Sequence, residues 1–533
     1  MVSANVGPSI TVPDPEEPFG SAVRARGLPS LEESLLSQVG ATHVPGEEGR
    51  LPSRGPGGDP DPSERGPEWD RRSDLLPIGS VLFLAFAVRV LLVGRFPQVQ
   101  ADEGLWTTST KNFLLFGDWF MDERSHLFLS PVFHLLSLVP FWVFGPSIEA
   151  ARLVSVVAGT LSVALVYLLA LRLFRDRSIA LVSALLLALD PWAVITSRQA
   201  MTESVLLFFV LATAVLLLGR RREIILAGVC FALAILTKLN AGAMGIAFGG
   251  FLLLSPALDP DGGSWRERMG DAAIFGVVAL GLAGLGYWAM AQIDPGRFME
   301  VFSRELGGAH VGSEGAATGR LAIRPALIGG SVLELIRMNP FLVPLAAIGA
   351  AVAATRRRPA VVFIALWLVV GLGFPLLQVY QPIRYFFPAL PALILLVAAL
   401  LVALRQVAPR GDLKVIAATA FVLAFSGAYL SMNFVVNRGN AAAVVAEWAR
   451  QNTDSDDVLL LAAYLATDPP NRAYAHDIVE HFPGGMDEAV QRLGVRYIIW
   501  DSAEWPSEMR EELASRYREV QSWHFGAAFE VVR

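Results

Sequence analysis

Long apolar runs alternate with short polar segments through most of this chain. Each run covers roughly 16 to 23 residues, the length that a helix rising about 1.5 Å per residue needs to cross the hydrocarbon of a bilayer. The pattern predicts about eleven transmembrane helices. The predicted spans are residues 76–95, 152–174, 178–197, 203–219, 223–240, 241–256, 271–292, 339–355, 360–378, 386–405 and 414–432.

One further apolar run, residues 127–146 (LFLSPVFHLLSLVPFWVFGP), is predicted not to cross. Its prolines, His134 and its Trp and Phe residues suit a juxtamembrane helix that lies in the outer interface. If this run crossed, every later loop would change sides.

The two ends of the chain lack such runs. Residues 1–74 are rich in Pro, Gly, Glu, Asp and Arg without periodicity, which predicts a disordered tail because too little apolar surface is available to offset ordering entropy. After the membrane domain at 75–433, helix-like and strand-like patterns such as AAAVVAEWARQ, DVLLLAA and VRYIIWD alternate. Residues 437–533 are therefore expected to form a small extracytoplasmic α/β domain.

Composition supports an α-helical polytopic membrane protein. The 533 residues are 54% hydrophobic and only 17% charged, with a mean hydropathy of +0.49. The net charge of -6 is spread by region rather than pooled in one patch, so nucleic-acid binding has no support. Cys230 is the only cysteine and excludes an intrachain disulfide.

Basic residues predict the orientation in the cell (plasma) membrane. With a cytoplasmic N-terminus, every strong Arg cluster between spans falls on the cytoplasmic side, as the positive-inside rule requires. The C-terminal domain is then extracytoplasmic. The clusters are Arg172, Arg175 and Arg177; Arg220, Arg221 and Arg222; Arg266 and Arg268; Arg356, Arg357 and Arg358; and Arg405, Arg410 and Lys414.

Four polar pairs lie at the outer ends of the predicted helices. Charges at membrane depth are costly and persist with a partner or a task, so acids and cations on one face, roofed by loops, predict an active site. Each pair also has a structural interpretation, as a helix cap, an interfacial ion pair, a lysine that reaches the headgroups or part of an aromatic belt. The pairs are Asp102 and Glu103, Arg198 and Glu203, Lys238 and Asn240, and Arg384 and Tyr385.

Five motifs in order resemble the glycosyltransferase C superfamily. They are ADE, a Pro-containing helix that ends in FGPSIEAARL, DPWAVITSRQAMTES, GVCFALAILTKLN and QPIRYFFPALP. Within that superfamily the chain resembles the branch of the dolichyl-phosphate-mannose protein mannosyltransferases and the aminoarabinose transferase of lipid A. The likeness covers residues 76–400.

The resemblance implies roles for the residues at matching positions. The acidic pair Asp102 and Glu103 corresponds to the family's catalytic carboxylate. Where several relatives carry a charged Pro-Pro motif, this chain has HLFLSPVF, and its polar candidates are His126 and His134. The implied substrate-binding residues are Arg198, Glu203, Lys238, Asn240, Arg384, Tyr385 and His134.

These residue types suit sugar transfer from a polyprenyl-phosphate donor to an extracytoplasmic acceptor. The leaving phosphate is a stable anion that cations such as Lys238 and Arg384 can stabilise. Asp102 is the expected general base, and attack opposite the phosphate inverts the anomeric carbon. A divalent ion held by Asp102, Glu103 and Glu203 stays open.

Two other functions remain open from the sequence. A transporter or flippase of lipid-linked saccharides would show internal repeats and charges near the bilayer midplane, whereas a non-catalytic scaffold would tolerate loss of Asp102. In the C-terminal stretch, His476, Asp477 and His481 can be drawn as a metal site, although their spacing favours solvated loop residues.

Overall fold

The structure is a computed structural model of the whole chain. The expected disordered tail falls outside the described residues up to residue 70, and so do His476, Asp477 and His481. All described residues belong to one compact unit, residues 67–533. The structure describes residues 71–119, 126–258, 264–307, 325–354, 358–377, 383–406, 411–436, 441–462 and, with short gaps, 465–531.

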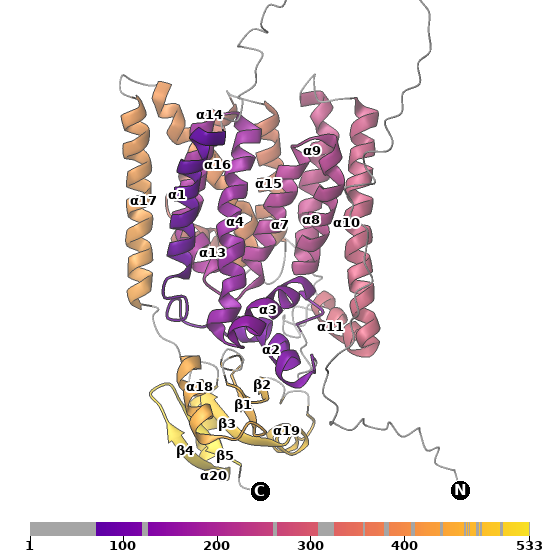
Figure 1. Ribbon diagram of the computed structural model, residues 1–533, viewed down its shortest axis with the longest axis vertical. Coiled ribbons are helices and arrows are strands. Elements are labelled where there is room, and N and C mark those ends of the chain that lie inside the picture. The colour runs from indigo at the N-terminus through magenta and orange to yellow at the C-terminus, as the bar shows by residue number, and fades with distance from the viewer. Residues whose placement is uncertain are drawn as a thin grey trace, which may run out of the picture. The chain divides into compact units, whose positions relative to one another are not determined.

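Long helices pack side by side in a bundle (Figure 1). Each predicted span overlaps one of these helices, because apolar runs of that length satisfy their backbone groups only as helices in lipid. The bundle contains α1 (Arg71–Val90), α4 (Ile148–Phe174), α5 (Arg177–Leu189), α7 (Thr202–Leu217), α8 (Ile224–Thr237), α9 (Met244–Leu258), α10 (Trp265–Ile293), α14 (Leu342–Ala354), α15 (Arg358–Leu376), α16 (Leu390–Ala403) and α17 (Gly411–Val436).

Several of these helices suit a bilayer. Among the described residues, six helices are long and apolar enough to cross, or up to eight if each of two bent pairs is one span. Their outer faces are apolar, since α10 exposes Val277 and Leu280 and α17 exposes Phe421. The count of about eleven spans stays a prediction.

The predicted span 178–197 is wrong as one continuous helix. It breaks at Asp190 into α5 and α6 (Pro191–Ser197), which meet at 56°. Pro191 has no N–H to continue the helix, and the Asp190 carboxylate accepts from the Ala193 N–H at 2.9 Å, which caps α6.

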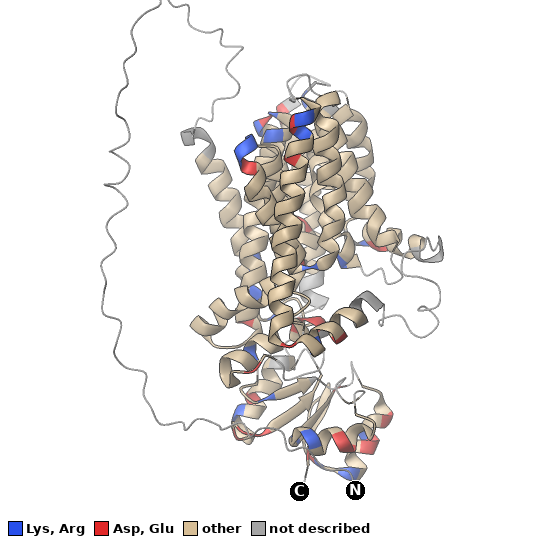
Figure 2. Cartoon of the chain, turned by 90° about the vertical axis from the view of Figure 1, so that its right-hand side faces the viewer, with Lys and Arg blue, Asp and Glu red and all other residues tan. Residues whose placement is uncertain are grey.

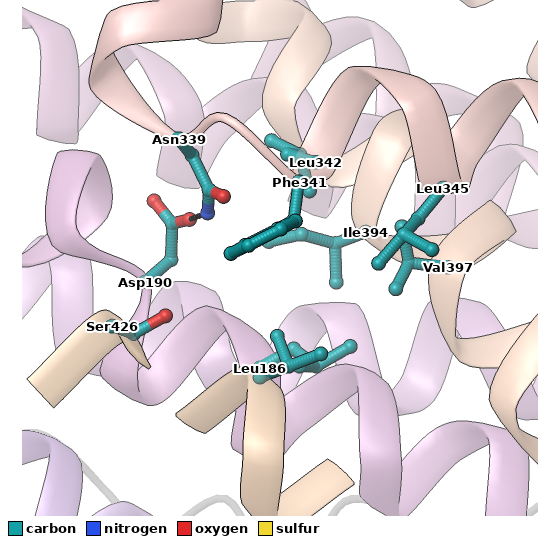
Figure 3. A pocket seen from close by; sticks show the side chains of 10 residues that line it. Leu186, Asp190, Asn339, Phe341, Leu342, Leu345, Ile394, Val397 and Ser426 are labelled. Atoms are coloured by element: carbon teal, nitrogen blue, oxygen red, sulfur yellow. Dashed lines mark hydrogen bonds between the residues drawn. The ribbon is translucent and has the colours of Figure 1, made fainter. Parts of the chain in front are cut away.

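A second bent helix pair contacts this break. α13 (Pro325–Met338) and α14 are bent by 92° around Asn339, whose Nδ2 donates to Asp190 Oδ2 at 2.8 Å. Figure 3 shows this bond at the edge of a small cavity, whose other lining side chains are apolar apart from Ser426. The cavity includes none of the site residues that the sequence predicted.

Two short helices lie at one end of the bundle, beside the C-terminal strands (Figure 1). α2 (Ala101–Phe116) follows the loop after α1, and α3 (Pro131–Phe144) occupies the run that was predicted to lie in the interface. α3 buries Phe133 and Phe141 against the protein and leaves Val139 and Trp142 exposed. This outer apolar face is what an interfacial helix requires.

The opposite end of the bundle carries many Lys and Arg residues (Figure 2). Arg172 bonds Glu223 at 3.1 Å there, and Arg221 bonds Asp271 at 2.9 Å. Arg172 and Arg221 therefore lie at the end of the bundle opposite to α2 and α3.

The C-terminal segment contains a five-stranded mixed sheet in the order β2-β1-β3-β5-β4. β1 is parallel to β2 and β3, whereas β5 is antiparallel to β3 and β4. Leu460, Ile498 and Phe529 are fully buried in its core. Its elements are α18 (Ala441–Asn452), β1 (Val458–Leu461), β2 (Ala473–Ala475), α19 (Gly485–Leu493), β3 (Val495–Asp501), α20 (Ser507–Arg516), β4 (Arg518–Ser522) and β5 (Gly526–Glu530).

Candidate active site

Asp102 lies in the first turn of α2 and pairs with an arginine that is distant from it in the sequence. Arg384 lies on the 3-10 helix η3 (Ile383–Ala389), and its Nη1 is 2.6 Å from Asp102 Oδ2. Both side chains are 29% exposed, so a ligand can reach them.

A second ion pair adjoins the first. Glu203, in the first turn of α7, is buried and lies 2.5 Å from Nζ of Lys238, the C-cap residue that follows α8. Arg384 Nε is 3.7 Å from the same Glu203 oxygen, so Arg384 bridges two carboxylates. The Lys238 ammonium also lies 4.8 Å from the centre of the Tyr385 ring, within the range of a cation–π contact.

Five predicted residues thus meet where α2, α7, α8 and η3 come together. They carry two carboxylates and two cations, so the formal charge of the cluster is balanced. A balanced cluster offsets part of the desolvation cost of its charges. The five are Asp102, Glu203, Lys238, Arg384 and Tyr385.

Glu103 does not join this cluster. Arg152 of α4 donates two hydrogen bonds of 2.7 Å to its carboxylate, and the Ala200 N–H donates a third at 2.7 Å. Both side chains are fully buried, and Arg152 also donates to the carbonyls of Val93 and Pro97. This bidentate pair joins α2 to α4 and to the turn before α7, which favours a structural role for Glu103. The catalytic role that the sequence assigned to it stays a prediction.

The hydrogen bonds that the structure gives Arg198 are to the backbone, and its predicted substrate-binding role stays a prediction. It donates to the carbonyls of Val88, Arg89, Leu91 and Phe96 at 2.5 to 3.2 Å. Carbonyls at a helix end lack partners within the helix, and Arg198 supplies them for α1. Glu203 pairs with Lys238 and not with Arg198, the residue that the sequence analysis grouped with it.

His134 and Asn240 have no hydrogen bond or ion pair to these five residues within the part of the chain that the structure describes. His134 is buried in α3, with Nδ1 2.8 Å from Thr110 Oγ1. Asn240 follows Lys238 on the 3-10 helix η2 (Leu239–Ala243), and its side-chain oxygen is buried without a hydrogen-bond partner among the described residues.

The three acids considered for a metal ion do not converge. Asp102 and Glu203 approach each other through Arg384, while Glu103 is fully engaged by Arg152. Within the ranges that the structure describes, no group of three or more His, Cys, Asp or Glu residues is arranged to hold a metal.

Sequence reasoning missed Arg152 and Asp190. Arg152 stands at the start of a long apolar run, where it looks like an ordinary interfacial arginine. The signal for Asp190 was the Asp-Pro pair inside a predicted span, since proline rarely continues a helix.

Comparisons with known proteins agree with this architecture. Residues 130–283 match the family model described as dolichyl-phosphate-mannose-protein mannosyltransferase. An undecaprenyl phosphate-alpha-4-amino-4-deoxy-L-arabinose arabinosyl transferase of Pseudomonas paraeruginosa is 30% identical over 357 residues, which are 61% of this chain and 60% of the relative. Its namesake in Erwinia tasmaniensis is 29% identical over 212 residues, 36% of each chain. The match thus spans between a third and three-fifths of these relatives.

Solved structures share the fold. ArnT from Cupriavidus metallidurans bound to undecaprenyl phosphate has a TM-score of 0.59 at 16% identity, covering 86% of this chain and 98% of that one. The oligosaccharyltransferase of Archaeoglobus fulgidus with a tethered acceptor peptide has a TM-score of 0.53 at 13% identity, covering 86% of this chain and 74% of that one.

These comparisons confirm the resemblance to the glycosyltransferase C superfamily, in its ArnT-like branch. The chain is a multi-pass membrane protein with the ArnT-like fold.

Proposed function

We propose that this protein is an integral-membrane glycosyltransferase that moves a sugar from a polyprenyl-phosphate donor to an acceptor outside the cytoplasm. The curated relatives are named as transferases with an undecaprenyl-phosphate sugar, and one structural neighbour is titled as bound to undecaprenyl phosphate. The observation that carries the proposal is the pairing of Asp102 with Arg384 next to Lys238.

The two cations are the proposed ligands of the donor phosphate. Lys238 and Arg384 are each held by a carboxylate in the resting cluster. An entering phosphate would compete for Arg384, and a bidentate guanidinium–phosphate contact would draw it from Asp102. Donor binding would thereby release the Asp102 carboxylate at the moment when a base is needed.

Asp102 is the proposed general base. The acceptor oxygen forms a bond to the anomeric carbon while the bond from that carbon to the phosphate oxygen breaks. The bonding electrons leave with the phosphate, which stays on the lipid, and the acceptor proton passes to Asp102. Such a base typically contributes 10²- to 10⁴-fold, and attack opposite the leaving phosphate inverts the anomeric carbon.

The remaining residues have supporting roles in this proposal. Glu203 holds the Lys238 ammonium in place, and the Tyr385 ring covers that ammonium. The side-chain oxygen of Asn240 has no hydrogen-bond partner among the described residues, and we assign it to a sugar hydroxyl.

We further propose the orientation and division of the chain given by its charges. The Arg-rich end faces the cytoplasm with the N-terminus, and the Asp102 end faces outward. Residues 1–74 are then a cytoplasmic tail, 75–433 the transferase domain and 437–533 an extracytoplasmic α/β domain. The position of Arg172 and Arg221 at the end of the bundle opposite to Asp102 supports this orientation.

The test is donor consumption in membranes. Membranes that carry the protein are incubated with undecaprenyl-phosphate aminoarabinose or mannose labelled in the sugar. We expect free undecaprenyl phosphate and a labelled acceptor, identified by mass spectrometry of glycolipids and glycoproteins. Membranes without the protein are the control. Movement of intact donor across vesicles with no covalent transfer would instead support a flippase.

A further inference from the structure

Lys111 is a fully buried cation in the middle of α2, outside the cluster described above. A lysine on a helix at the membrane surface usually extends to water, because burying an ammonium is costly. Here its Nζ donates to the carbonyl of Pro469 at 3.0 Å and to that of Asn471 at 3.1 Å. The side chain therefore binds the backbone of the C-terminal segment.

Thr107 makes a second contact with the C-terminal segment, this time between side chains. Its Oγ1 is 2.5 Å from Oγ1 of Thr467, and both residues are fully buried. Thr107 and Lys111 are four residues apart, so they lie on one face of α2, one turn apart. We call these the docking contacts: Thr107 with Thr467, and Lys111 with Pro469 and Asn471.

The C-terminal partner is itself held in place. Asn471 is fully buried, and its side-chain amide donates to Thr453 Oγ1 at 3.0 Å and to the Asp454 carbonyl at 2.8 Å. These bonds tie the segment before β2 to the loop between α18 and β1. The docking contacts therefore rest on a braced part of the C-terminal fold.

Asp102 is on the same helix as the docking contacts. It precedes Lys111 by nine residues, about 13 Å along the helix axis. Its partner Arg384 lies on η3, an element separate from α2. If α2 moves as a rigid body, the distance between Asp102 and Arg384 changes with it.

We propose that Thr107 and Lys111 are positioning residues, through which the C-terminal domain fixes Asp102 opposite Arg384 and the donor phosphate. This inference rests on the proposed glycosyltransferase function. A displacement of about 1 Å at a reacting group can cost 10²-fold in rate, so a loosened α2 would lower turnover without removing a catalytic group.

The test uses the full-length protein with Lys111→Met, which keeps the stem and removes the donors, and Thr107→Val. We expect kcat to fall about 10- to 100-fold, with a nearly unchanged KM for the donor because Lys238 and Arg384 are intact. Thr107→Ser retains the hydroxyl and is expected to keep kcat. Thr108→Val is the matched control, since Thr108 Oγ1 donates to the Gly104 carbonyl of α2 itself.

If the two residues had a purely structural role, their variants would lower the melting temperature and the folded yield but leave kcat per folded molecule unchanged. That result would overturn the inference.

A second readout is independent of activity. Hydrogen–deuterium exchange of residues 101–106 is expected to rise in Lys111→Met but not in Lys414→Met, an exposed lysine on α17. If wild type shows no transfer, the proposed function fails. Unchanged exchange in Lys111→Met would overturn the inference in either case.

Discussion

Arg384 contacts Asp102 at 2.6 Å and lies 3.7 Å from Glu203, so one guanidinium joins two carboxylates from α2 and α7. In this arrangement the proposed base and the proposed phosphate ligand neutralise each other while the site is empty. Under the proposed function, we expect a phosphate that binds Arg384 to weaken that pairing and to leave Asp102 free to accept a proton. Donor binding and activation of the base would then be coupled through the Arg384 side chain.

Arg384 is expected to act in the transition state as well as in binding. Arg384→Gln removes the cation that receives the developing phosphate charge, and we expect a loss of about 10²- to 10³-fold in kcat/KM. Arg384→Lys keeps the charge but loses the planar fork, so it should recover only part of the loss. Steady-state kinetics with a polyprenyl-phosphate donor measures both. Arg450→Gln, an exposed arginine on α18, is the control, and equal activity of Arg384→Gln and this control would contradict the role.

Variants of the Glu203–Lys238 pair are expected to affect stability and catalysis differently. Glu203 is almost fully buried and Lys238 is 15% exposed, so Glu203→Gln leaves a largely buried ammonium without its nearest carboxylate. We expect a lower melting temperature in detergent and weaker donor binding. The double variant Glu203→Gln with Lys238→Met should regain stability because the unpaired charge is gone, yet remain inactive. An active double variant would remove Lys238 from the mechanism.

Glu103 is expected to matter for folding and not for the chemical step. Its bond to Arg152 is buried on both sides, and removal of one partner of such a pair costs about 3 to 5 kcal/mol. Glu103→Gln should therefore lower thermal stability sharply while the folded fraction keeps most of its kcat. Single-turnover rates normalised to folded protein distinguish this outcome. A rate loss equal to that of an Asp102 variant would return Glu103 to the catalytic machinery.

The orientation is expected to appear in cysteine labelling. With Cys230 replaced by Ala, single cysteines are introduced at Asp118 and Glu508 near the site end and at Arg222 at the Arg-rich end, all exposed positions. A membrane-impermeant maleimide on intact cells should label the first two and not the third. Labelling of Arg222→Cys but not Asp118→Cys in intact cells would reverse the proposed topology.

Much of the helical fold could be predicted from the sequence, since an apolar run of sufficient length has few other ways to satisfy its backbone in lipid. The convergence of Asp102, Lys238 and Arg384 followed from the same logic, because helix ends on one side of a membrane share a plane. The sequence could not separate Asp102 from Glu103. Consecutive helix residues point about 100° apart, and which one faces the site depends on where Arg152 lies.

Other features depended on contacts that no local pattern encodes. The burial of Lys111 requires the C-terminal segment to dock on α2, and the role of Arg198 requires the end of α1 to lie beside it. In both cases the partners are backbone carbonyls, which any residue type provides. The sequence therefore contains no residue pattern from which these contacts could be predicted.

The most direct test of the central claim compares Asp102→Asn with Asp118→Asn, an exposed carboxylate that follows α2. Single-turnover transfer from a polyprenyl-phosphate sugar is measured on equal amounts of folded protein. We expect Asp102→Asn to be slower by about 10²- to 10⁴-fold while the donor still binds, and Asp118→Asn to match wild type. A wild-type transfer rate in Asp102→Asn would contradict the assignment of Asp102 as the base.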